Sequence, residues 1–285
     1  MRTVFITGVS SGIGKSIAEE LAKSKLFYVI GTVRKIEDGL SLKNKYKNFF
    51  FPLIMDITDK EQIQNSYIET KKILKKNNSY LCSIINNAGV AFGGPIKYLD
   101  ANLFRKQFEI NFFGLIEVTN TFLDLLISSN NNNLKNKIIN IGSVSGKRAY
   151  PFAGPYVASK HALEGLTDSF RRELLIHDID IVLIQPGPIK TPLWDKVPTV
   201  ENNPFLKTEY GPALKIFNEK YLKAVIKDGY EPKIISKKII KILETNNPKS
   251  RYVITKNILK NYYIPGFLPD RFIDKLIGKM LKLIK

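Results

Sequence analysis

The chain has few residues of the kinds that form disulfides or bind metal ions: one cysteine and two histidines among 285 residues. Cys82 cannot form an intrachain disulfide. Because it lies in an apolar run, we expect a buried structural thiol and a reducing compartment. Neither His161 nor His177 belongs to a cluster of metal-ligating residues, so we expect no metal site.

Acidic residues are also scarce, with 26 aspartates and glutamates against 44 lysines and arginines, which gives a formal net charge of +18. Lysine and asparagine occur throughout, including the polar tract at residues 129–135, so we attribute much of this charge to composition. No nucleic-acid-binding motif and no aromatic–basic repeat accompanies the charge, and a nucleic-acid partner is not expected.

Long apolar runs are a third absence. No run approaches the roughly 20 residues of a membrane span, and the first predicted strand begins almost at Met1, which leaves no room for a signal peptide. We therefore expect a cytoplasmic protein. What the sequence does contain is strand and helix patterns that alternate from end to end, and these predict one α/β domain over residues 1–285.

A glycine-rich turn lies between the first predicted strand and helix. A short apolar run at residues 3–7 leads into Gly8, Gly12 and Gly14, and a helical pattern follows at residues 15–25. This order is the phosphate-binding arrangement of dinucleotide sites. Gly8 permits the tight turn, Gly12 lets the backbone approach the pyrophosphate, and Gly14 allows close packing of the helix, whose N-terminus attracts the anion.

The ends of the next two strands bear on which dinucleotide binds. An NAD site ends its second strand with Asp or Glu for the ribose hydroxyls, whereas here Val33 is followed by Arg34 and Lys35. A guanidinium can pair with a 2′-phosphate, so NADP(H) is favoured over NAD(H); the alternative is that Arg34 only faces solvent. Asp56, at the end of the third strand, can accept from the adenine amino group or cap the helix that begins near Asp59.

Three further residues indicate acid–base chemistry. Tyr156 and Lys160 are four apart after Pro155, so they share one face of a helix's first turns. A nearby ammonium lowers the pKa of a phenol, but a shift of about three units needs about 4 kcal/mol, which one solvated lysine does not supply. An oxidised nicotinamide ring would add the second positive charge. Ser143, after an apolar strand, can hold a carbonyl oxygen that the tyrosine protonates. The alternative is a half-buried ring beside a solvated charge.

Two asparagine positions remain ambiguous from the residues alone. A buried strand at residues 81–85 ends in the small polar segment 86–89, beside the expected cofactor. Asn111 lies within a long predicted helix at residues 100–127, among isoleucine and phenylalanine neighbours. It is either a satisfied core amide or a placed functional group.

Taken together, the motifs resemble the single-domain branch of the short-chain dehydrogenase/reductase family. The matching segments are Thr7-Gly8-x-x-x-Gly12-Ile13-Gly14, Asp56, Asn86-Asn87-Ala88-Gly89, Asn111, Ser143, Tyr156-x-x-x-Lys160 and Pro186-Gly187-x-x-x-Thr191. The resemblance implies a Rossmann-type, doubly wound parallel sheet of about seven strands with helices on both faces. It also implies a tetrad. Tyr156 would donate the proton in reduction, Lys160 would lower its pKa and hold the nicotinamide ribose, Ser143 would orient the carbonyl, and Asn111 would fix a proton-relay water.

The resemblance further implies cofactor contacts and an assembly. Thr191 would bind the carboxamide, Asn87 would lie near the adenosine, and Arg34 would hold the 2′-phosphate. Some NADP-preferring members carry a basic residue in the glycine turn where this chain has Ser11. A homodimer or homotetramer formed through the helices at 100–127 and 155–177 is expected. The full set of expected cofactor contacts is Gly8, Ser10, Ser11, Gly12, Ile13, Gly14, Arg34, Asp56, Ile57, Asn87, Ala88, Gly89, Tyr156, Lys160, Pro186, Gly187, Ile189 and Thr191.

Two segments follow the motifs shared with the family. Residues 188–232 are rich in proline and aromatic residues, and family members place their substrate loop here, at the carboxyl edge of the sheet. An apolar wall for a bulky lipophilic carbonyl or alcohol would come from this loop, although the same side chains can be ordinary core: Leu193, Trp194, Phe205, Leu214, Phe217 and Tyr221.

Residues 258–285 form a C-terminal extension with the pattern of a basic amphipathic helix. One stripe is apolar, and the lysines lie off it. Such a helix can lie on an anionic bilayer, cover the pocket or pack on a neighbouring subunit. Leu-Pro-Asp-Arg tails of this kind resemble those of retinoid and steroid dehydrogenases in the family. The stripe consists of Ile273, Leu276, Ile277, Met280, Leu281 and Ile284, and the lysines are Lys275, Lys279, Lys282 and Lys285.

We therefore predict an NADP(H)-dependent oxidoreductase that interconverts a carbonyl and an alcohol, on a lipophilic substrate, with Tyr156 as general acid or base. The cofactor carries the hydride chemistry. One alternative is a non-catalytic NADP(H)-binding, membrane-associated sensor, which would not need all four tetrad residues. The other is an epimerase or dehydratase of the same fold that retains its cofactor, and net cofactor consumption distinguishes it.

Overall fold

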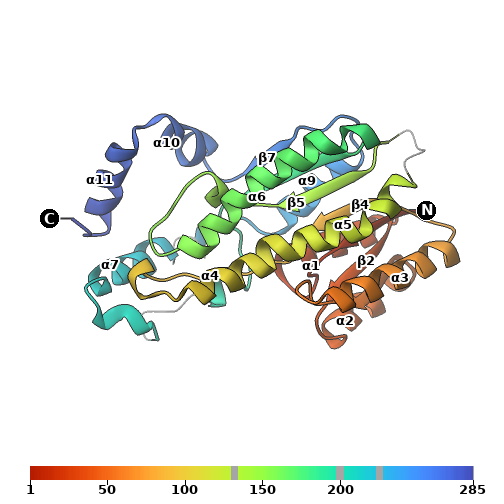
Figure 1. Ribbon diagram of the computed structural model, residues 1–285, viewed down its shortest axis with the longest axis horizontal. Helices are drawn as coiled ribbons and strands as arrows, with labels where there is room; N and C mark the ends of the chain where they lie inside the picture. Colours follow the sequence, from red (N-terminus) through yellow and green to blue (C-terminus); the bar gives the residue numbers. More distant parts are fainter. Residues whose placement is uncertain (130–133, 197–201, 223–226, 285) are drawn as a thin grey trace.

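The alternating pattern forms one parallel sheet of seven strands, as the family resemblance implied, and their order is β3-β2-β1-β4-β5-β6-β7 (Figure 1). The computed structural model describes residues 1–129, 134–196, 202–222 and 227–284, without the side chains of Lys196 and Tyr221. The strand order changes direction between β1 and β4, and such sheets bind ligands at the carboxyl ends of the strands there. The strands are β1 (Arg2–Ile6), β2 (Phe27–Val33), β3 (Phe50–Ile54), β4 (Tyr80–Asn86), β5 (Lys137–Ile141), β6 (Asp180–Pro186) and β7 (Arg251–Ile254).

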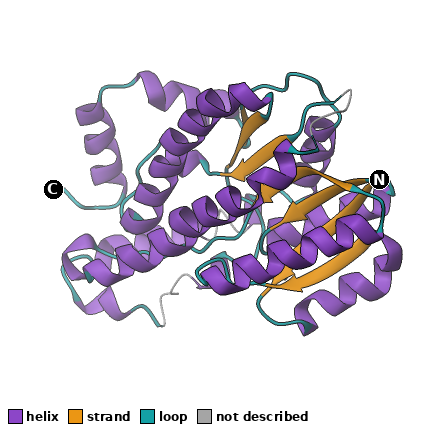
Figure 2. Ribbon diagram, turned by 45° about the vertical axis from the view of Figure 1, so that its right-hand side comes forward, coloured by secondary structure: helices purple, strands orange, loops and turns teal. Residues whose placement is uncertain are grey.

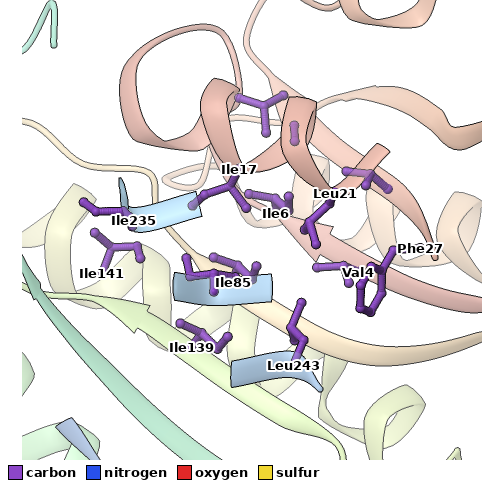
Figure 3. Close-up of a cluster of buried hydrophobic side chains, with 14 of the residues drawn as sticks. Val4, Ile6, Ile17, Leu21, Phe27, Ile85, Ile139, Ile141, Ile235 and Leu243 are labelled. Atoms are coloured by element: carbon purple, nitrogen blue, oxygen red, sulfur yellow. The ribbon is translucent and has the colours of Figure 1, made fainter. Parts of the chain in front are cut away.

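Helices cover both faces of the sheet, which is why its central strands read as continuous apolar runs (Figure 2). On one face α1 (Gly12–Ser24), α2 (Glu37–Tyr46) and α9 (Lys233–Leu243) enclose a core that includes residues of β1, α1 and α9 (Figure 3). On the other face lie α3 (Lys60–Lys76), α5 (Gly114–Ile127) and α6 (Gly154–Glu173).

The long helix predicted at residues 100–127 is interrupted. It consists of α4 (Ala101–Phe108), a π-helical turn η3 (Glu109–Phe113) and α5, with Asn111 at the centre of the turn. Single π turns inside α-helices occur frequently at functional sites. Nothing in the local sequence distinguished this turn from ordinary helix, because its aromatic and aliphatic neighbours fit either.

The same helical segment corrects the expectation that no segment would have the length and apolar character of a membrane span. Ala101–Ile127 meets both criteria. Its most apolar stretch of 18 residues has a mean hydropathy of 1.4, and 39% of that stretch is buried. Its residues Val118, Phe122 and Leu126 are fully buried in the core beside the sheet, and the Phe122 ring lies 4.1 Å from that of Phe5, centroid to centroid. Core helices of this kind satisfy the same criteria as spans.

Short helical pieces connect the main elements and form the last third of the chain. Within the segment 188–232, α7 is followed directly by the π-helical η8, and residues 223–226 lie outside the described part. The C-terminal extension stands at the end of the molecule opposite the N-terminus (Figure 1). The pieces are η1 (Lys47–Phe49), η2 (Ile96–Tyr98), η4 (Val144–Gly146), η5 (Leu174–His177), η6 (Trp194–Lys196), η7 (Pro204–Lys207), α7 (Gly211–Ile216), η8 (Phe217–Leu222), η9 (Leu259–Tyr263), α10 (Ile264–Phe267) and α11 (Asp270–Met280).

Cys82 and His161 behave as structural residues. Cys82 is buried in β4, and this burial raises the pKa of its thiol to about 11, as expected for an inert packing residue. His161 is exposed on α6, where its Nδ1 lies 2.9 Å from the Val157 carbonyl oxygen. Among the described residues, no group of three or more histidine, cysteine or acidic residues could hold a metal ion.

Candidate active site

The glycine turn has the backbone that its sequence predicts. Gly8 and Gly12 adopt φ angles of +72° and +59°, in the left-handed region that favours glycine. A Cβ on Gly14 would lie 2.1 Å from the Gly8 carbonyl oxygen and 2.3 Å from Asn87 Nδ2, so only glycine fits there. The turn therefore brings backbone close to the space at the carboxyl end of β1.

The N-terminus of α1 fits an anion. Ser11 is its N-cap residue but makes no side-chain capping hydrogen bond, and no acidic residue occupies the first turn. The backbone N–H groups at a helix start carry partial positive charge and lack intrahelical partners. Ser10 and Ser11 are exposed beside them. This cradle fits the pyrophosphate of a dinucleotide.

Asn87 has a structural task that sequence reasoning did not anticipate. Its Nδ2 donates to the carbonyl oxygens of Thr7 and Gly8, at 3.0 and 2.8 Å. In return, Thr7 Oγ1 accepts from the backbone N–H groups of Asn87 and Ala88, both at 3.0 Å. The end of β4 is therefore fixed to the glycine turn by four hydrogen bonds, and the predicted cofactor segment at 87–89 lies beside the turn.

Arg34 and Lys35 follow β2 on the exposed surface, and within the described residues neither forms an ion pair. A free guanidinium at the end of the second strand fits a 2′-phosphate, and no carboxylate replaces it there.

Asp56 and Asp59 divide the two tasks that the sequence left open. Asp59 caps α3 by accepting from the Gln62 backbone N–H at 3.0 Å. Asp56 Oδ1 instead accepts from the N–H and hydroxyl of Thr58, at 2.9 and 2.8 Å, and the residue stays partly exposed at the carboxyl end of β3. Asp56 is therefore not the helix cap, and Ile57 beside it is buried.

Tyr156, Ser143 and Lys160 converge at the carboxyl end of β5. Pro155 lies in the first turn of α6, as predicted, so Tyr156 and Lys160 project from one side of its first two turns. The Lys160 Nζ lies 5.8 Å from the centroid of the Tyr156 ring and donates to the Ile141 carbonyl oxygen at 2.8 Å. Ser143 interacts with the tyrosine hydroxyl, and its Oγ accepts from the Ser145 N–H at 3.1 Å.

Burial opposes charge on both groups of the tyrosine–lysine pair. It lowers the pKa of Lys160 to about 8, because desolvation disfavours the ammonium. Burial also raises the pKa of Tyr156. The hydrogen bond with Ser143 acts in the opposite direction but offsets only part of this rise. The lysine by itself therefore does not make this phenol acidic, and the need for a second positive charge stays a prediction.

Asn111 is a satisfied buried amide that bridges two segments of the site. Its Oδ1 accepts from the Val90 N–H at 2.9 Å, and its Nδ2 donates to the Val90 carbonyl oxygen at 3.0 Å and to Ser159 Oγ at 3.2 Å. Both N–H donors are used. The amide therefore connects η3, the loop after β4, and α6, three residues after Tyr156.

The loop after β6 approaches the glycine turn. Gly187 donates its N–H to the Ile254 carbonyl oxygen at 2.9 Å, and a Cβ there would lie 2.4 Å from Thr255 Oγ1. Ile189 is buried and forms an isolated β-bridge with Tyr230. A Cβ on Gly12 would lie 3.3 Å from the Thr191 side chain, so the predicted Pro186–Thr191 segment reaches the turn.

An aromatic cluster includes Phe152, close to Tyr156 in the sequence, and sequence reasoning identified only part of this cluster. Phe217 and Phe205 belong to the predicted wall, but Leu214 is buried core and the Trp194 Nε1 donates to the Ile189 carbonyl oxygen. Phe152, four residues before Tyr156, was missed because its backbone, with φ of 66°, lies in the uncommon left-handed region. The rings in contact are Tyr98, Phe152, Phe205, Tyr210 and Phe217.

A buried carboxylate supports α6 one turn beyond Lys160. Glu164 accepts from Gln185 Nε2 at 2.6 Å and pairs with Arg251 Nε at 3.0 Å and Lys147 Nζ at 3.4 Å. These contacts connect α6 to β6, to β7 and to the segment after Ser143. A buried charge with several partners is expensive to break, so we regard Glu164 as a residue that positions the helix.

Comparisons with known proteins agree with this geometry. The family model of short chain dehydrogenases matches residues 2–202. The chain is 38% identical to the NADPH-dependent 3-dehydrocapnine reductase of Ornithobacterium rhinotracheale, over 99% of this chain and 98% of that protein. It is 29% identical to mouse estradiol 17-beta-dehydrogenase 2, over 98% of this chain and 74% of that protein.

A solved structure has the same fold and a bound cofactor. The NADP-bound structure of ElxO superposes with a TM-score of 0.68 and 25% identity, over 89% of this chain and 96% of that chain. The predicted preference for NADP(H) agrees with these relatives. The chain belongs to the short-chain dehydrogenase family of NAD(P)-dependent oxidoreductases.

Proposed function

We propose that the protein is an NADP(H)-dependent oxidoreductase that interconverts a ketone or aldehyde and the corresponding alcohol, with Tyr156 as general acid and base. The observation that carries the proposal is the convergence of Tyr156, Ser143 and Lys160 at the carboxyl end of the sheet, the same end that carries the glycine turn. An isolated tyrosine–lysine pair would not need a serine hydroxyl on the phenol or a dinucleotide cradle next to it.

The cofactor would be held by backbone and by a few side chains. The turn from Gly8 to Gly14 and the start of α1 would bind the pyrophosphate, and Arg34 would pair with the 2′-phosphate. Asp56 keeps Oδ2 for the adenine amino group, because Thr58 uses only Oδ1. The segments 87–89 and 186–191 would line the remaining length, with Lys160 on the nicotinamide ribose. When bound, NADPH supplies the hydride.

The protein's own residues would manage the proton. Ser143 Oγ already accepts from a backbone N–H, so its hydroxyl hydrogen is free to hold the substrate oxygen or the phenol. Tyr156 would give its proton to the substrate oxygen in reduction and take it back in oxidation. Lys160 would stabilise the phenolate and then lose or regain a proton readily, since its pKa is already near 8.

Asn111 would act by position rather than by holding a water through its amide N–H groups. Both of those donors are bound to protein, which leaves only the second lone pair of Oδ1 in the side chain. We propose that it holds the segment at Val90 against α6. The tetrad role implied by the family resemblance would then depend on the π turn that places Asn111.

We propose a lipophilic carbonyl substrate. The aromatic cluster of Phe152, Tyr210 and Phe217 continues from the segment that carries Tyr156. Two relatives are named for 3-dehydrocapnine and for estradiol. 3-Dehydrocapnine is therefore the first compound to test.

The deciding experiment follows NADPH absorbance with 3-dehydrocapnine, a panel of long-chain and short-chain ketones, and a steroid ketone. The proposal expects stoichiometric NADPH consumption with at least one long-chain or polycyclic ketone, and none with a Tyr156→Phe protein. Conversion of substrate without net NADPH consumption would instead indicate an epimerase or dehydratase. Tight NADPH binding with no turnover on any compound would indicate a sensor.

We also propose a homodimer or homotetramer. Only 39% of the most apolar stretch of Ala101–Ile127 is buried within the chain. Phe113, in the same helical segment, is about half exposed. A second copy packed along α4, α5 and α6 would remove this surface from water. Light scattering of the purified protein tests this, and a monomer at micromolar concentration would contradict it.

A further inference from the structure

The exposed apolar residues of the molecule concentrate in the C-terminal extension. Of the 21 large hydrophobic side chains that are exposed in the described part of the chain, nine lie between Leu259 and Ile284. Phe267, at the end of α10, is 85% exposed. Scattered apolar residues on a surface need no explanation, but a contiguous group of this size marks an interaction site.

Helix α11 has two apolar ridges, and its packing uses one of them. Ile273 and Ile277 are partly buried and Leu281 is buried, at the i, i+4, i+8 spacing of one helix side. The neighbouring ridge is Phe272, Leu276 and Met280, with exposed fractions of 55%, 48% and 46%. We call this second set the outer ridge. Internal packing therefore leaves a full apolar ridge in solvent.

A basic ridge runs beside the outer ridge. Arg271, Lys275 and Lys279 repeat at the same spacing, one residue earlier in each turn. Arg271 lies 3.9 Å from Asp274, and both side chains are largely exposed. Lys275 and Lys279 form no ion pair with any described residue. An exposed apolar ridge flanked by unpaired lysines is the pattern of a helix that lies in a membrane interface.

We propose that the C-terminal extension binds anionic lipid bilayers, with Phe267 and the outer ridge in the headgroup boundary and the basic ridge against the lipid phosphates. Charge complementarity decides between this occupant and a second copy. A symmetric dimer through α11 would place two basic ridges at one interface, between chains that each carry +18. An anionic surface attracts the same ridge instead.

The extension is fixed to the catalytic end of the molecule. The Tyr262 hydroxyl bonds with the Gln185 side chain at 3.0 Å, and Arg148 Nη2 donates to the Tyr262 carbonyl oxygen at 2.6 Å. Arg148 lies five residues after Ser143, and Gln185 lies near the carboxyl end of β6. A bound bilayer would therefore lie at the end of the sheet that holds Ser143. Binding itself goes beyond the proposed reaction and does not depend on it.

Vesicle sedimentation of the full chain tests the proposal. Phosphatidylcholine vesicles with and without phosphatidylglycerol would be compared at low and physiological salt. We expect at least about tenfold stronger partitioning onto the anionic vesicles, and weaker partitioning as salt shortens the Debye length to about 8 Å. Equal partitioning onto both compositions, or none onto either, would overturn the proposal.

Matched variants distinguish binding through the extension from non-specific adsorption by exposed apolar side chains elsewhere. The triple change Phe272→Ser, Leu276→Ser and Met280→Ser should weaken partitioning by about tenfold for each side chain. The control is Leu175→Ser with Ile176→Ser, which lie in η5, just before the amino end of β6, and are 70% and 83% exposed. It should leave partitioning unchanged, and equal losses in both proteins would contradict the proposal.

A second pair of changes tests the basic ridge. Lys275→Gln with Lys279→Gln should weaken binding to anionic vesicles by about fivefold per charge and leave the weak binding to phosphatidylcholine unchanged. Light scattering on the triple variant tests the other occupant. If the triple change splits an oligomer while vesicle binding persists, the outer ridge is a subunit interface and the bilayer proposal is wrong. NADPH binding confirms that each variant is folded.

Discussion

The first two thirds of the chain and the last third carry function in different ways. Up to Gly187, most candidate residues lie at the ends of buried strands or on the first turns of helices, where the backbone determines their position. Gly14, crowded by Gly8 and Asn87, and Tyr156, placed by the start of α6, are examples. Between Gly187 and Pro232 the described chain forms short helices and a π turn, and Tyr210 and Phe217 of this segment contact the ring of Phe152.

The difference teaches that chemistry and selectivity are encoded at different levels. A phosphate cradle or a proton donor needs a fixed backbone, so few residues satisfy each position and the pattern is visible as a motif. A lipophilic surface needs only enough apolar area, so many sequences satisfy it. Substitutions in the first region should therefore have large, specific effects, and those in the second should have smaller, substrate-dependent ones.

The largest expected effect is that of Tyr156→Phe. Removal of the phenolic proton should lower kcat/KM by about 1,000-fold, the contribution of general acid catalysis, while NADPH affinity changes little. Steady-state kinetics and fluorescence titration of NADPH measure the two quantities. The control is Tyr150→Phe, on the exposed loop before α6, which should retain activity. Normal turnover of the Tyr156→Phe enzyme would show that the Tyr156 phenol takes no part in the reaction.

Gly14→Ala should be next in size. Its Cβ would collide with backbone oxygen, so we expect the free energy of unfolding to fall by about 2 to 3 kcal/mol and NADPH binding to be lost. The matched control is Gly165→Ala, in the middle of α6, where a Cβ meets nothing within 4 Å. It should raise the free energy of unfolding by about 0.5 to 1 kcal/mol. Urea unfolding compares them, and two equal effects would contradict the crowded turn.

Arg34→Ala should change cofactor selectivity without changing the reaction. Loss of a charge-assisted pair with the 2′-phosphate should lower the ratio of NADPH to NADH efficiency by about 10- to 100-fold. The measurement is kcat/KM for both cofactors at one salt concentration. Arg271→Ala, whose side chain is 95% exposed in the extension, is the control and should leave the ratio unaltered. If the ratio is also unaltered in Arg34→Ala, the guanidinium only faces solvent.

The smallest effect is expected in the second region. Phe152→Ala removes a ring that contacts Tyr210 and Phe217, so KM for a long-chain ketone should rise about tenfold. Turnover of a short-chain ketone by the same protein serves as the control and should be nearly normal. Equal losses on both ketones would mean that Phe152 supports the fold of the Ser143 segment rather than the substrate.

The sequence predicted the sheet, the glycine turn and the positions of Tyr156, Ser143 and Lys160 because each depends on local patterns. It did not predict the π turn around Asn111, since the hydrogen bonds that stabilise it come from Val90 and Ser159, far away in the chain. It left Asp56 and Asp59 unresolved because either carboxylate could accept from a nearby backbone N–H, and the structure shows Asp59 accepting from Gln62 and Asp56 from Thr58. Phe152 was missed because its left-handed backbone is imposed by tertiary contacts, including its carbonyl oxygen accepting from Gly94 N–H at 2.8 Å.

The central claim is that Tyr156 becomes acidic only when an oxidised nicotinamide adds its positive charge to that of Lys160. The tyrosinate absorbance of the native protein and of Tyr156→Phe would be measured as a function of pH. The difference between the two curves reports the ionisation of the Tyr156 phenol alone. Without cofactor its pKa should lie above the ordinary 10.0, because burial raises it. With saturating NADP⁺ the same pKa should fall below that value. A pKa that does not move when NADP⁺ binds would contradict the account.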